Sequence, residues 1–156
     1  MATHPSSTVI RAWTRLARAQ QLAQGAIERR LKSAGLPPLA WHDALAELER
    51  AGEAGLRPFE LERELLLSQC NLSRLVDRLE SKRYVERRGC RDDGRGHVIA
   101  ITAAGRAIRR RMWTIYGGTI HSVMGAHLSS GQAAALDTVL ATVIAGAQAE
   151  YTVQTI

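Results

Sequence analysis

Between Leu56 and Glu80, the sequence LRPFELERELLLSQCNLSRLVDRLE sorts polar, basic and apolar side chains at helical spacing. A helix that enters the major groove of DNA needs small polar groups where bases are reached, basic groups for phosphates and an apolar back face. The candidates are Ser68, Gln69, Asn71 and Ser73 for bases, Arg74 and Arg78 for phosphates, and Leu72, Leu75, Val76 and Leu79 for the back face. The alternative is an amphipathic helix whose polar side meets only water.

Two short runs typical of β-strands, 84–88 and 97–101, flank the loop GCRDDGRG. Such a loop lets side chains project from the packed core, and an arginine there can enter a narrow, A·T-rich minor groove. The arginines of this hairpin are Arg87, Arg88, Arg91 and Arg95. Because a carboxylate repels phosphate, we expect Asp93 to pair with an arginine and fix the shape of the loop.

Apolar periodicity and capping residues predict the elements that position these side chains. We expect helices over 9–32, 39–50, 59–65, 69–81 and 102–125, and a last one beginning at Ser129 or Ser130. The first is preceded by the N-cap candidates Ser6 to Thr8. The order helix, helix, helix–turn–helix, hairpin, long helix, helix predicts a mainly α fold with a small β-hairpin wing, wrapped by terminal helices.

Charge is concentrated in one block of the chain. Residues 74–111 hold 12 basic and 5 acidic side chains, a local excess of +7, within a formal net charge of +6 for all 156 residues. Residues 112–156 contain no Lys or Arg, and only Asp137 and Glu150 are acidic. A basic face and a nearly uncharged tail, of the kind that a buried dimer interface needs, do not fit a uniformly basic protein of the ribosomal type.

Several functional classes lack support. Two cysteines are too few for a disulfide scaffold or a four-cysteine zinc site, and the five histidines show no metal-ligand spacing. No nucleophile elbow, P-loop, zinc-protease or dinucleotide motif is present. The first residues do not resemble a secretion signal, and no run of 18 apolar residues occurs. We therefore expect a cytoplasmic protein that is not an enzyme and that uses no cofactor, metal or membrane.

The run SRLVDRLESKRYVERRGCRDDGRGHVIAITAAGR resembles the signature stretch of MarR-family transcriptional regulators. The resemblance rests on RLVDRLE, on YVERR, on the D-x-R of Asp93 and Arg95, and on the I-T-x-x-G that ends at Gly105. It implies a homodimer with interleaved terminal helices, whose two winged lobes bind a palindromic DNA operator. It also implies a repressor that a small ligand, often an aromatic acid, releases from DNA by binding between the lobe and the dimer region.

Residue by residue, the resemblance carries DNA-binding roles to the following positions: Ser68, Gln69, Cys70, Asn71, Ser73, Arg74, Arg78, Arg91 and Arg95. Asp93 corresponds to the residue that stabilises the wing. The implied organisation is dimerisation by 1–35 and 106–156 and DNA binding by 36–105. Two positions depart from the family, since Leu66 and Arg83 stand where glycines are common. The first departure suggests a turn that is more tightly packed or differently shaped, and the second adds positive charge near DNA.

Aromatic residues are the candidates for a ligand site. Trp13, Trp41, His42, Trp113 and Tyr116 lie on helices that would line the family's pocket, and Asp43 follows His42. A tryptophan wall with a histidine can hold a planar carboxylate by stacking and charge-assisted hydrogen bonds. The alternatives are that the tryptophans are core residues and that His42 and Asp43 form a surface pair.

Two other functions remain open from the sequence. Cys70 lies near the predicted start of a helix, one turn before Arg74, where a thiol can be activated. A redox-sensing regulator that switches through Cys70 is therefore one alternative, and an inert cysteine is the simpler interpretation. The other alternative is a helical protein-interaction dimer that does not bind DNA and whose basic face meets an acidic protein.

Overall fold

The computed structural model of the chain describes residues 4–89 and 96–153, with side chains described as far as Glu150. The chain divides into two units, residues 1–119 and 120–156, which are described separately. The first contains α1 (Ser7–Ser33), α2 (Leu39–Ala51), the 3₁₀ turn η1 (Gly52–Ala54), α3 (Pro58–Leu65), α4 (Gln69–Ser81), β1 (Val85–Gly89), β2 (His97–Ile101) and nearly all of α5 (Ala103–Ile120). The second contains the π-helical turn η2 (His121–Gly125) and α6 (Ser130–Val153).

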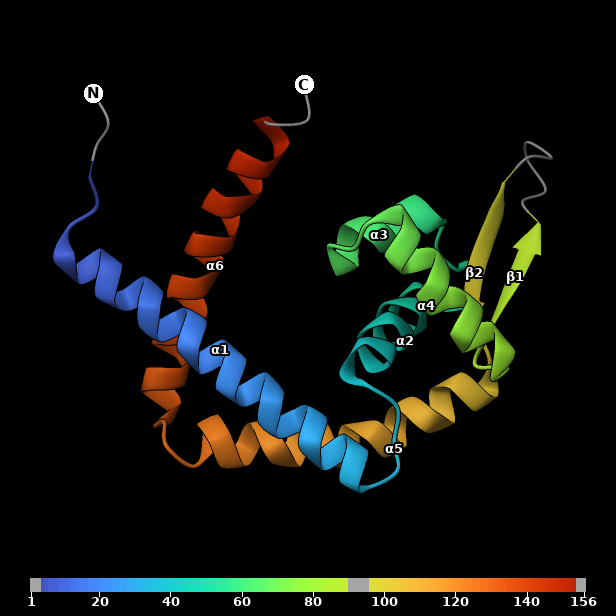
Figure 1. Cartoon of the computed structure of the whole chain (residues 1–156), viewed down its shortest axis with the longest axis horizontal. Coiled ribbons are helices and arrows are strands. Elements are labelled where there is room, and N and C mark those ends of the chain that lie inside the picture. Colours follow the sequence, from blue (N-terminus) through green and yellow to red (C-terminus); the bar gives the residue numbers. More distant parts are fainter. Residues whose placement is uncertain (1–3, 90–95, 154–156) are drawn as a thin grey trace. The chain divides into compact units, whose positions relative to one another are not determined.

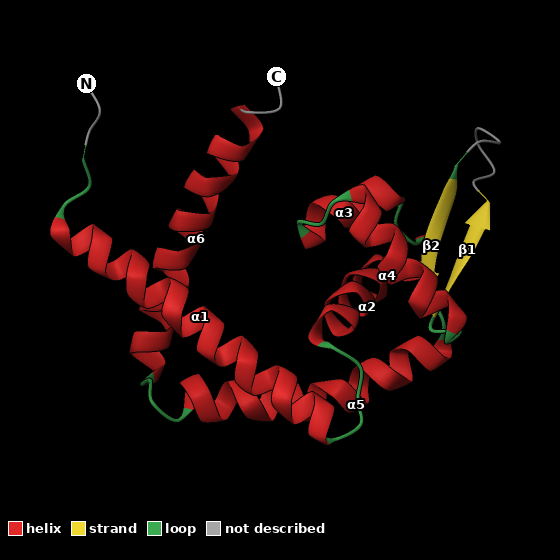
Figure 2. Ribbon diagram, viewed as in Figure 1, coloured by secondary structure: helices red, strands yellow, loops and turns green. Residues whose placement is uncertain are grey.

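The described elements confirm the predicted fold class, a mainly helical chain with one antiparallel hairpin (Figures 1 and 2). β2 has the predicted bounds, and β1 begins one residue later than predicted. The four apolar residues predicted for the back face of α4 are all buried. They join a core whose fully buried members include Leu31, Leu45, Leu48, Leu61, Ile99 and Met112. Each such side chain contributes about 1.5–3 kcal/mol through burial.

Four helices begin after a serine or threonine whose hydroxyl caps the first turn. The side-chain oxygens of Ser6, Ser68, Thr102 and Ser129 accept hydrogen bonds from the backbone N–H three residues ahead, over 3.1–3.3 Å. These bonds satisfy N–H groups that have no partner within the first turn of a helix. At α6, Gln132 also accepts a bond from the backbone N–H of Ser129 at 2.9 Å, which completes a reciprocal capping box.

Three helices end in the same backbone motif, although only one has glycine there. After α1, α3 and α4, a left-handed residue lets the next N–H bond back to a carbonyl five residues earlier, at 2.9–3.0 Å. The left-handed residues are Gly35, Leu66 and Arg83, with φ of +68°, +53° and +59°. Leu66 and Arg83 thus adopt the left-handed backbone conformation that glycine usually takes at the end of a helix. Leu66 is 80% exposed, so of the two alternatives expected for this turn, a tightly packed or a differently shaped one, tight packing is wrong.

The hairpin is tied to the helix–turn–helix by a third short segment. Its register pairs Val85 with Ile101 and Gly89 with His97. Leu56, just before α3, exchanges two backbone hydrogen bonds with Ile99, at 2.9 and 2.8 Å. Gly55 makes this approach possible, since it has φ +67° and a Cβ there would lie 2.5 Å from the Ile99 carbonyl oxygen.

The start of α5 packs directly on the chain that leaves α4. Thr102 donates its backbone N–H to the Tyr84 carbonyl at 3.0 Å and its hydroxyl to the Arg83 carbonyl at 2.7 Å. Gly105 follows one turn later, and a Cβ there would lie 2.1 Å from the Tyr84 oxygen. The I-T-x-x-G pattern therefore combines a helix cap with a glycine that is needed for close approach.

Helix α6 exposes several apolar side chains to solvent. Val139, Val143 and Ile144 are 45–58% exposed. Within the part of the chain that the structure describes, no single helix is long and apolar enough to cross a membrane; Ala103–Gly125 and Ser130–Glu150 reach that length and composition only when taken together.

We predict that Gly105→Ala destabilises the fold by about 3 kcal/mol or more, because the new methyl group would collide with the backbone of Tyr84. Gly118→Ala is the matched control in the same helix, because no described atom would lie within 4 Å of its Cβ. The control should stabilise α5 by about 0.5–1 kcal/mol. Free energies of unfolding from denaturant titrations measure both effects, and equal effects would contradict the assigned packing.

Candidate functional site

The polar face of α4 brings together the side chains predicted to contact DNA. Gln69, Cys70 and Asn71 are exposed in its first turn, and Ser73, Arg74 and Arg78 are exposed further along. The Ser68 hydroxyl caps the helix, as its bond from the Asn71 N–H shows. Among the described residues, the guanidinium groups of Arg74 and Arg78 have no ion-pair partner. This face can therefore present amide donors and acceptors together with two available positive charges.

Arg87 and Arg88 do not project from the loop as predicted, because both lie in β1 and are paired. Arg87 contacts Asp77 at 2.7 Å and also pairs with Glu80, so that it joins the hairpin to α4. Arg88 donates to Glu86 at 2.6 Å and to the Glu53 carbonyl at 3.1 Å. These two arginines hold the hairpin against its neighbours, and most of their charge is compensated.

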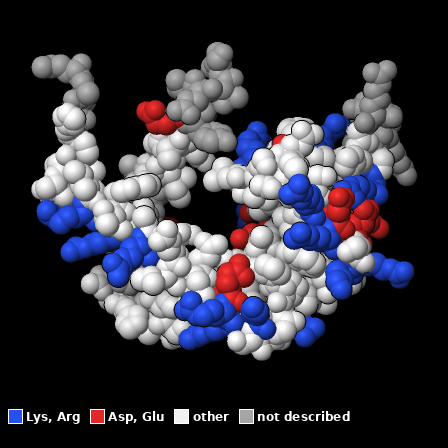
Figure 3. All heavy atoms as spheres, in the orientation of Figure 1, with Lys and Arg blue, Asp and Glu red and all other residues white. Residues whose placement is uncertain are grey.

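The other loop residues singled out in the sequence, Arg91, Asp93 and Arg95, lie outside the described residues, as does Cys90. Their proposed roles in the minor groove and in wing shape remain predictions. On the face of the lobe that Figure 3 shows, basic and acidic side chains are intermixed and do not form one uniform basic area. The charge available to a polyanion is thus smaller than the sequence count indicates.

His42, Trp113 and Tyr116 form an aromatic cluster between α2 and α5. The His42 ring stacks on Trp113 at a centroid distance of 5.9 Å and meets Tyr116 edge-on at 4.9 Å. His42 is 4% exposed, whereas Trp113 is 50% exposed. The pair of His42 with Asp43, 3.3 Å from Nδ1 to Oδ1, is therefore buried on its histidine side and is not a surface pair.

One polar atom of this cluster is buried without a partner among the described residues. His42 Nε2 is buried and has no hydrogen-bond partner among the described residues. Such an unpaired polar atom costs free energy unless a ligand or a water satisfies it. Burial raises the pKa of the Tyr116 phenol, and the negative charge of Asp43 raises it further, so the phenol stays neutral at physiological pH. The cluster therefore offers an indole face, a phenol and an imidazole nitrogen within one small region.

The remaining aromatic candidates lie elsewhere. Trp41 packs edge-on against Tyr84 at 6.1 Å, beside the hydrophobic core. Trp13 is 65% exposed near the start of α1, close in sequence to the exposed Val9 and Ile10. The structure thus unites three of the five residues predicted for a ligand site.

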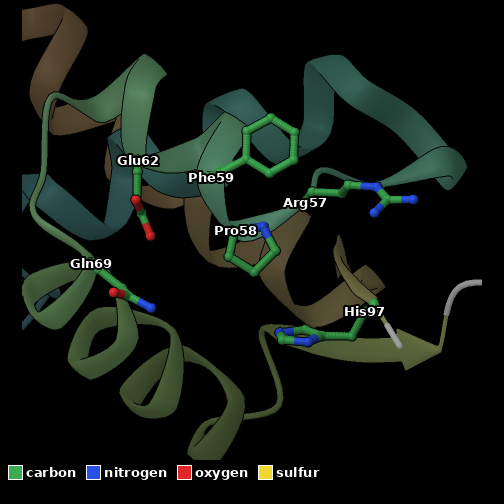
Figure 4. Close-up of a pocket in the computed structure, with 7 residues that line it drawn as sticks. Arg57, Pro58, Phe59, Glu62, Gln69 and His97 are labelled. Carbon is green, nitrogen blue, oxygen red and sulfur yellow. The ribbon is translucent and has the colours of Figure 1, made fainter. Parts of the chain in front are cut away.

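The structure also shows a surface hollow that the sequence did not suggest (Figure 4). We call it the α3–hairpin hollow, and its lining residues are Arg57, Pro58, Phe59, Glu62, Gln69, Gly96 and His97. They come from the start of α3, the first residue of α4 and the start of β2. Because three separate segments contribute, no local spacing could have indicated the hollow.

The helix–turn–helix, the paired hairpin and the flanking helices define a winged helix-turn-helix protein. The model of the MarR family matches residues 34–96. Over these residues the chain is similar to the MarR family.

Individual relatives agree with this similarity. The multiple antibiotic resistance protein MarR of Escherichia coli (strain K12) is 31% identical over 91 residues, which span 58% of this chain and 63% of that relative. The DNA complex of Sco3205, a MarR family transcriptional regulator from Streptomyces coelicolor, has a similar fold, with TM-score 0.84, 23% identity and coverage of 94% and 91%. BpsR of Bordetella bronchiseptica, whose DNA binding is regulated by 6-hydroxynicotinic acid, gives TM-score 0.74 at 17% identity, with coverage of 85% and 98%.

We predict that stability falls as pH rises above 10, the ordinary pKa of a tyrosine phenol, because the Tyr116 pKa is raised in the folded chain. The contribution of the Tyr116 phenol to the free energy of unfolding is fully present below pH 10. It is lost as pH rises through the folded pKa, because in that range the phenol ionises in the unfolded chain but not in the folded chain. Tyr116→Phe should therefore show a shallower loss of unfolding free energy above pH 10. Denaturant titrations between pH 8 and 11 measure this, and identical pH profiles would contradict it.

Proposed function

We propose that this chain is a DNA-binding transcriptional repressor, not an enzyme. The observation that carries the proposal is the exposed face of α4, where Gln69 and Asn71 lie one turn before the available guanidinium of Arg74. Asparagine and glutamine amides read adenine, and arginines grip phosphates. The DNA complex of the similar fold Sco3205 supports the same use of a winged lobe.

The proposed active form is a homodimer that binds a palindromic operator. Helix α1 exposes Val9, Ile10, Trp13 and Leu22, each more than half accessible, and α6 exposes its own apolar side chains. Exposed apolar surface on this scale favours a partner surface of the same kind. Two lobes related by two-fold symmetry would then read half-sites about one DNA turn apart, roughly 34–36 Å.

The His42 cluster is the proposed effector site, and a planar aromatic acid is the proposed ligand class. Trp113 can stack on its ring, and a doubly protonated His42 can donate one N–H to Asp43 through Nδ1 and the other to the ligand's carboxylate through Nε2. The regulation of BpsR by 6-hydroxynicotinic acid supports this class. A ligand that prefers one spacing of the lobes would release DNA by shifting the population of dimers.

A thiol switch at Cys70 is the second candidate. The Cys70 side chain is free and exposed in the first turn of α4, among the positions that would reach bases. Oxidation there would add a bulky group to the DNA-contacting face. The two mechanisms differ in where the signal enters, at α4 for the thiol and at α2 and α5 for the acid.

We predict that the contacts of α4 separate into two kinds. Asn71→Ala should reduce discrimination between the operator and a mutated half-site by about 1–3 kcal/mol. Arg78→Gln should weaken binding to every sequence and reduce the salt slope, the change in log K per log of salt concentration, by about 0.9. Arg50→Gln is the control, since Arg50 is exposed on a different helix, α2, where it pairs with Glu47.

Fluorescence anisotropy with the promoter of the protein's own gene, over a salt series, gives both quantities. If the unaltered protein shows no sequence-specific binding, the regulator function is wrong and a protein-interaction dimer is favoured. If Arg50→Gln reduces the salt slope as much as Arg78→Gln, the assignment of the α4 face is wrong.

We predict that His42→Phe abolishes the response to aromatic acids and leaves DNA binding intact, because phenylalanine preserves the ring packing and removes Nε2. Benzoate, 4-hydroxybenzoate and 6-hydroxynicotinate are the probes, measured by thermal shift and by release of operator DNA. Trp41→Phe is the control, because Trp41 packs on Tyr84 instead. A normal response in His42→Phe would contradict the site, and release by peroxide that Cys70→Ser abolishes would favour the thiol switch.

A further inference from the structure

Asp43 determines which nitrogen of a neutral His42 ring carries the hydrogen. Its carboxylate oxygen lies 3.3 Å from His42 Nδ1, and a carboxylate only accepts hydrogen bonds. The single hydrogen of a neutral imidazole must therefore be on Nδ1. Nε2 is then a lone-pair acceptor, and it is the buried atom that has no partner among the described residues. With a neutral ring, the site thus faces a ligand with an acceptor and not with a donor.

This tautomer does not suit the carboxylate of an aromatic acid. The lone pair of Nε2 would face a lone pair of the ligand, and the ligand would add a second negative charge beside a ring that already contacts Asp43. His42 is 4% exposed, so water screens these charges poorly at the ring. A hydrogen on Nε2 replaces the repulsion by a charge-assisted hydrogen bond. It also means that binding of the acid anion leaves the total charge of the cluster unchanged.

Several charged side chains of the packed helices α1, α2 and α5 are engaged in other contacts. These contacts are Glu28 with the Leu39 N–H, Arg30 with the Thr119 hydroxyl, Glu47 with Arg50, and Glu49 with Arg109. The Tyr116 phenol meets the His42 ring edge-on and stays neutral, because burial and the charge of Asp43 raise its pKa. Arg110 is exposed one turn before Trp113, so it is the cation that competes with His42 for a carboxylate.

We propose that the His42 site takes up one proton with each aromatic acid that it binds. The proton comes from solvent and forms the Nε2–H bond, and no other bond changes. The inference rests on the proposed function, in which His42 and Trp113 hold such an acid. Because one acid anion and one proton bind together, occupancy follows the product of their concentrations, which is proportional to the concentration of the undissociated acid. The same total amount of acid therefore releases DNA more effectively at lower pH.

Isothermal titration calorimetry of the full chain measures the number of protons directly. Benzoate is titrated at pH 8 in two buffers with different enthalpies of ionisation, because the difference in observed heat gives the protons taken up. At this pH an imidazole ordinarily carries one hydrogen, and the Tyr116 phenol is neutral. We expect about one proton per bound benzoate, and an affinity that falls about tenfold for each unit of pH between 7.5 and 9.

Benzamide is the matched ligand, because it has the shape of benzoate and no charge. Its amide N–H can donate to the Nε2 lone pair of a neutral ring. Benzamide should therefore bind without proton uptake and with an affinity that does not depend on pH. Equal proton uptake with the two ligands would contradict the role assigned to the carboxylate.

Asp43→Asn tests the part that Asp43 plays. An asparagine amide can donate to Nδ1, which lets a neutral ring carry its hydrogen on Nε2. This variant should bind benzoate with proton uptake close to zero and little dependence on pH, a change that a purely structural role would not produce. Glu47→Gln is the matched control, because it removes one carboxylate from the same helix, where Glu47 pairs with Arg50. The control should still take up about one proton.

Three outcomes would overturn the inference while leaving the regulator function intact. The first is benzoate binding by the unaltered protein without proton uptake, and the second is uptake that persists in Asp43→Asn. The third is loss of benzoate binding in Arg110→Gln but not in His42→Phe, which would assign the carboxylate to the guanidinium. Absence of benzoate binding between pH 6 and 9 would overturn both the inference and the proposed ligand class. Absence of sequence-specific DNA binding would instead remove the regulator function and leave the proton count unchanged.

Discussion

The geometry of the winged lobe, to which we assign DNA binding, depends on one close backbone contact, the approach of the Tyr84 carbonyl to the start of α5. Tyr84 follows the left-handed Arg83 that ends α4, and Thr102 closes the hairpin at the same point by bonding to both of their carbonyls. Gly105 allows the approach because it has no Cβ. The end of α4, the base of the hairpin and the start of α5 are thereby fixed to one another, and the side chains proposed to contact DNA take their positions from this junction.

The basic residues that are concentrated in residues 74–111 have different structural roles. The basic block of the sequence is divided among residues that face solvent on α4, residues that hold the hairpin, and residues that join α5 to the lobe. Arg87 forms ion pairs with Asp77 and Glu80, and Arg109 forms an ion pair with Glu49 of α2. An acidic group that would repel DNA on α4 is thus compensated by an arginine of the wing, and the same contact sets the position of the wing.

Local patterns were sufficient for much of the fold and for part of the site. Helix periodicity predicted the buried back face of α4, and hydroxyl side chains marked the starts of helices. Both features depend only on residues within one or two helical turns. The sequence did not indicate that Arg87 and Arg88 would be paired, that His42 would be buried, or that Arg57 and His97 would share a hollow. Each of these results from segments that are distant in sequence and meet only after folding, so no spacing rule contains them.

Helix α2 connects the proposed ligand site with the winged lobe. Its first backbone N–H donates to Glu28 of α1 at 3.1 Å, and near its other end Glu49 pairs with Arg109 of α5. His42 lies between these two attachments, against Trp113 and Tyr116 of α5, while Leu45 and Leu48 of the same helix are buried in the core of the lobe. A ligand that engages His42 therefore acts on a helix held at both ends, and a change in its packing against α5 must be transmitted to the lobe as a whole rather than absorbed locally.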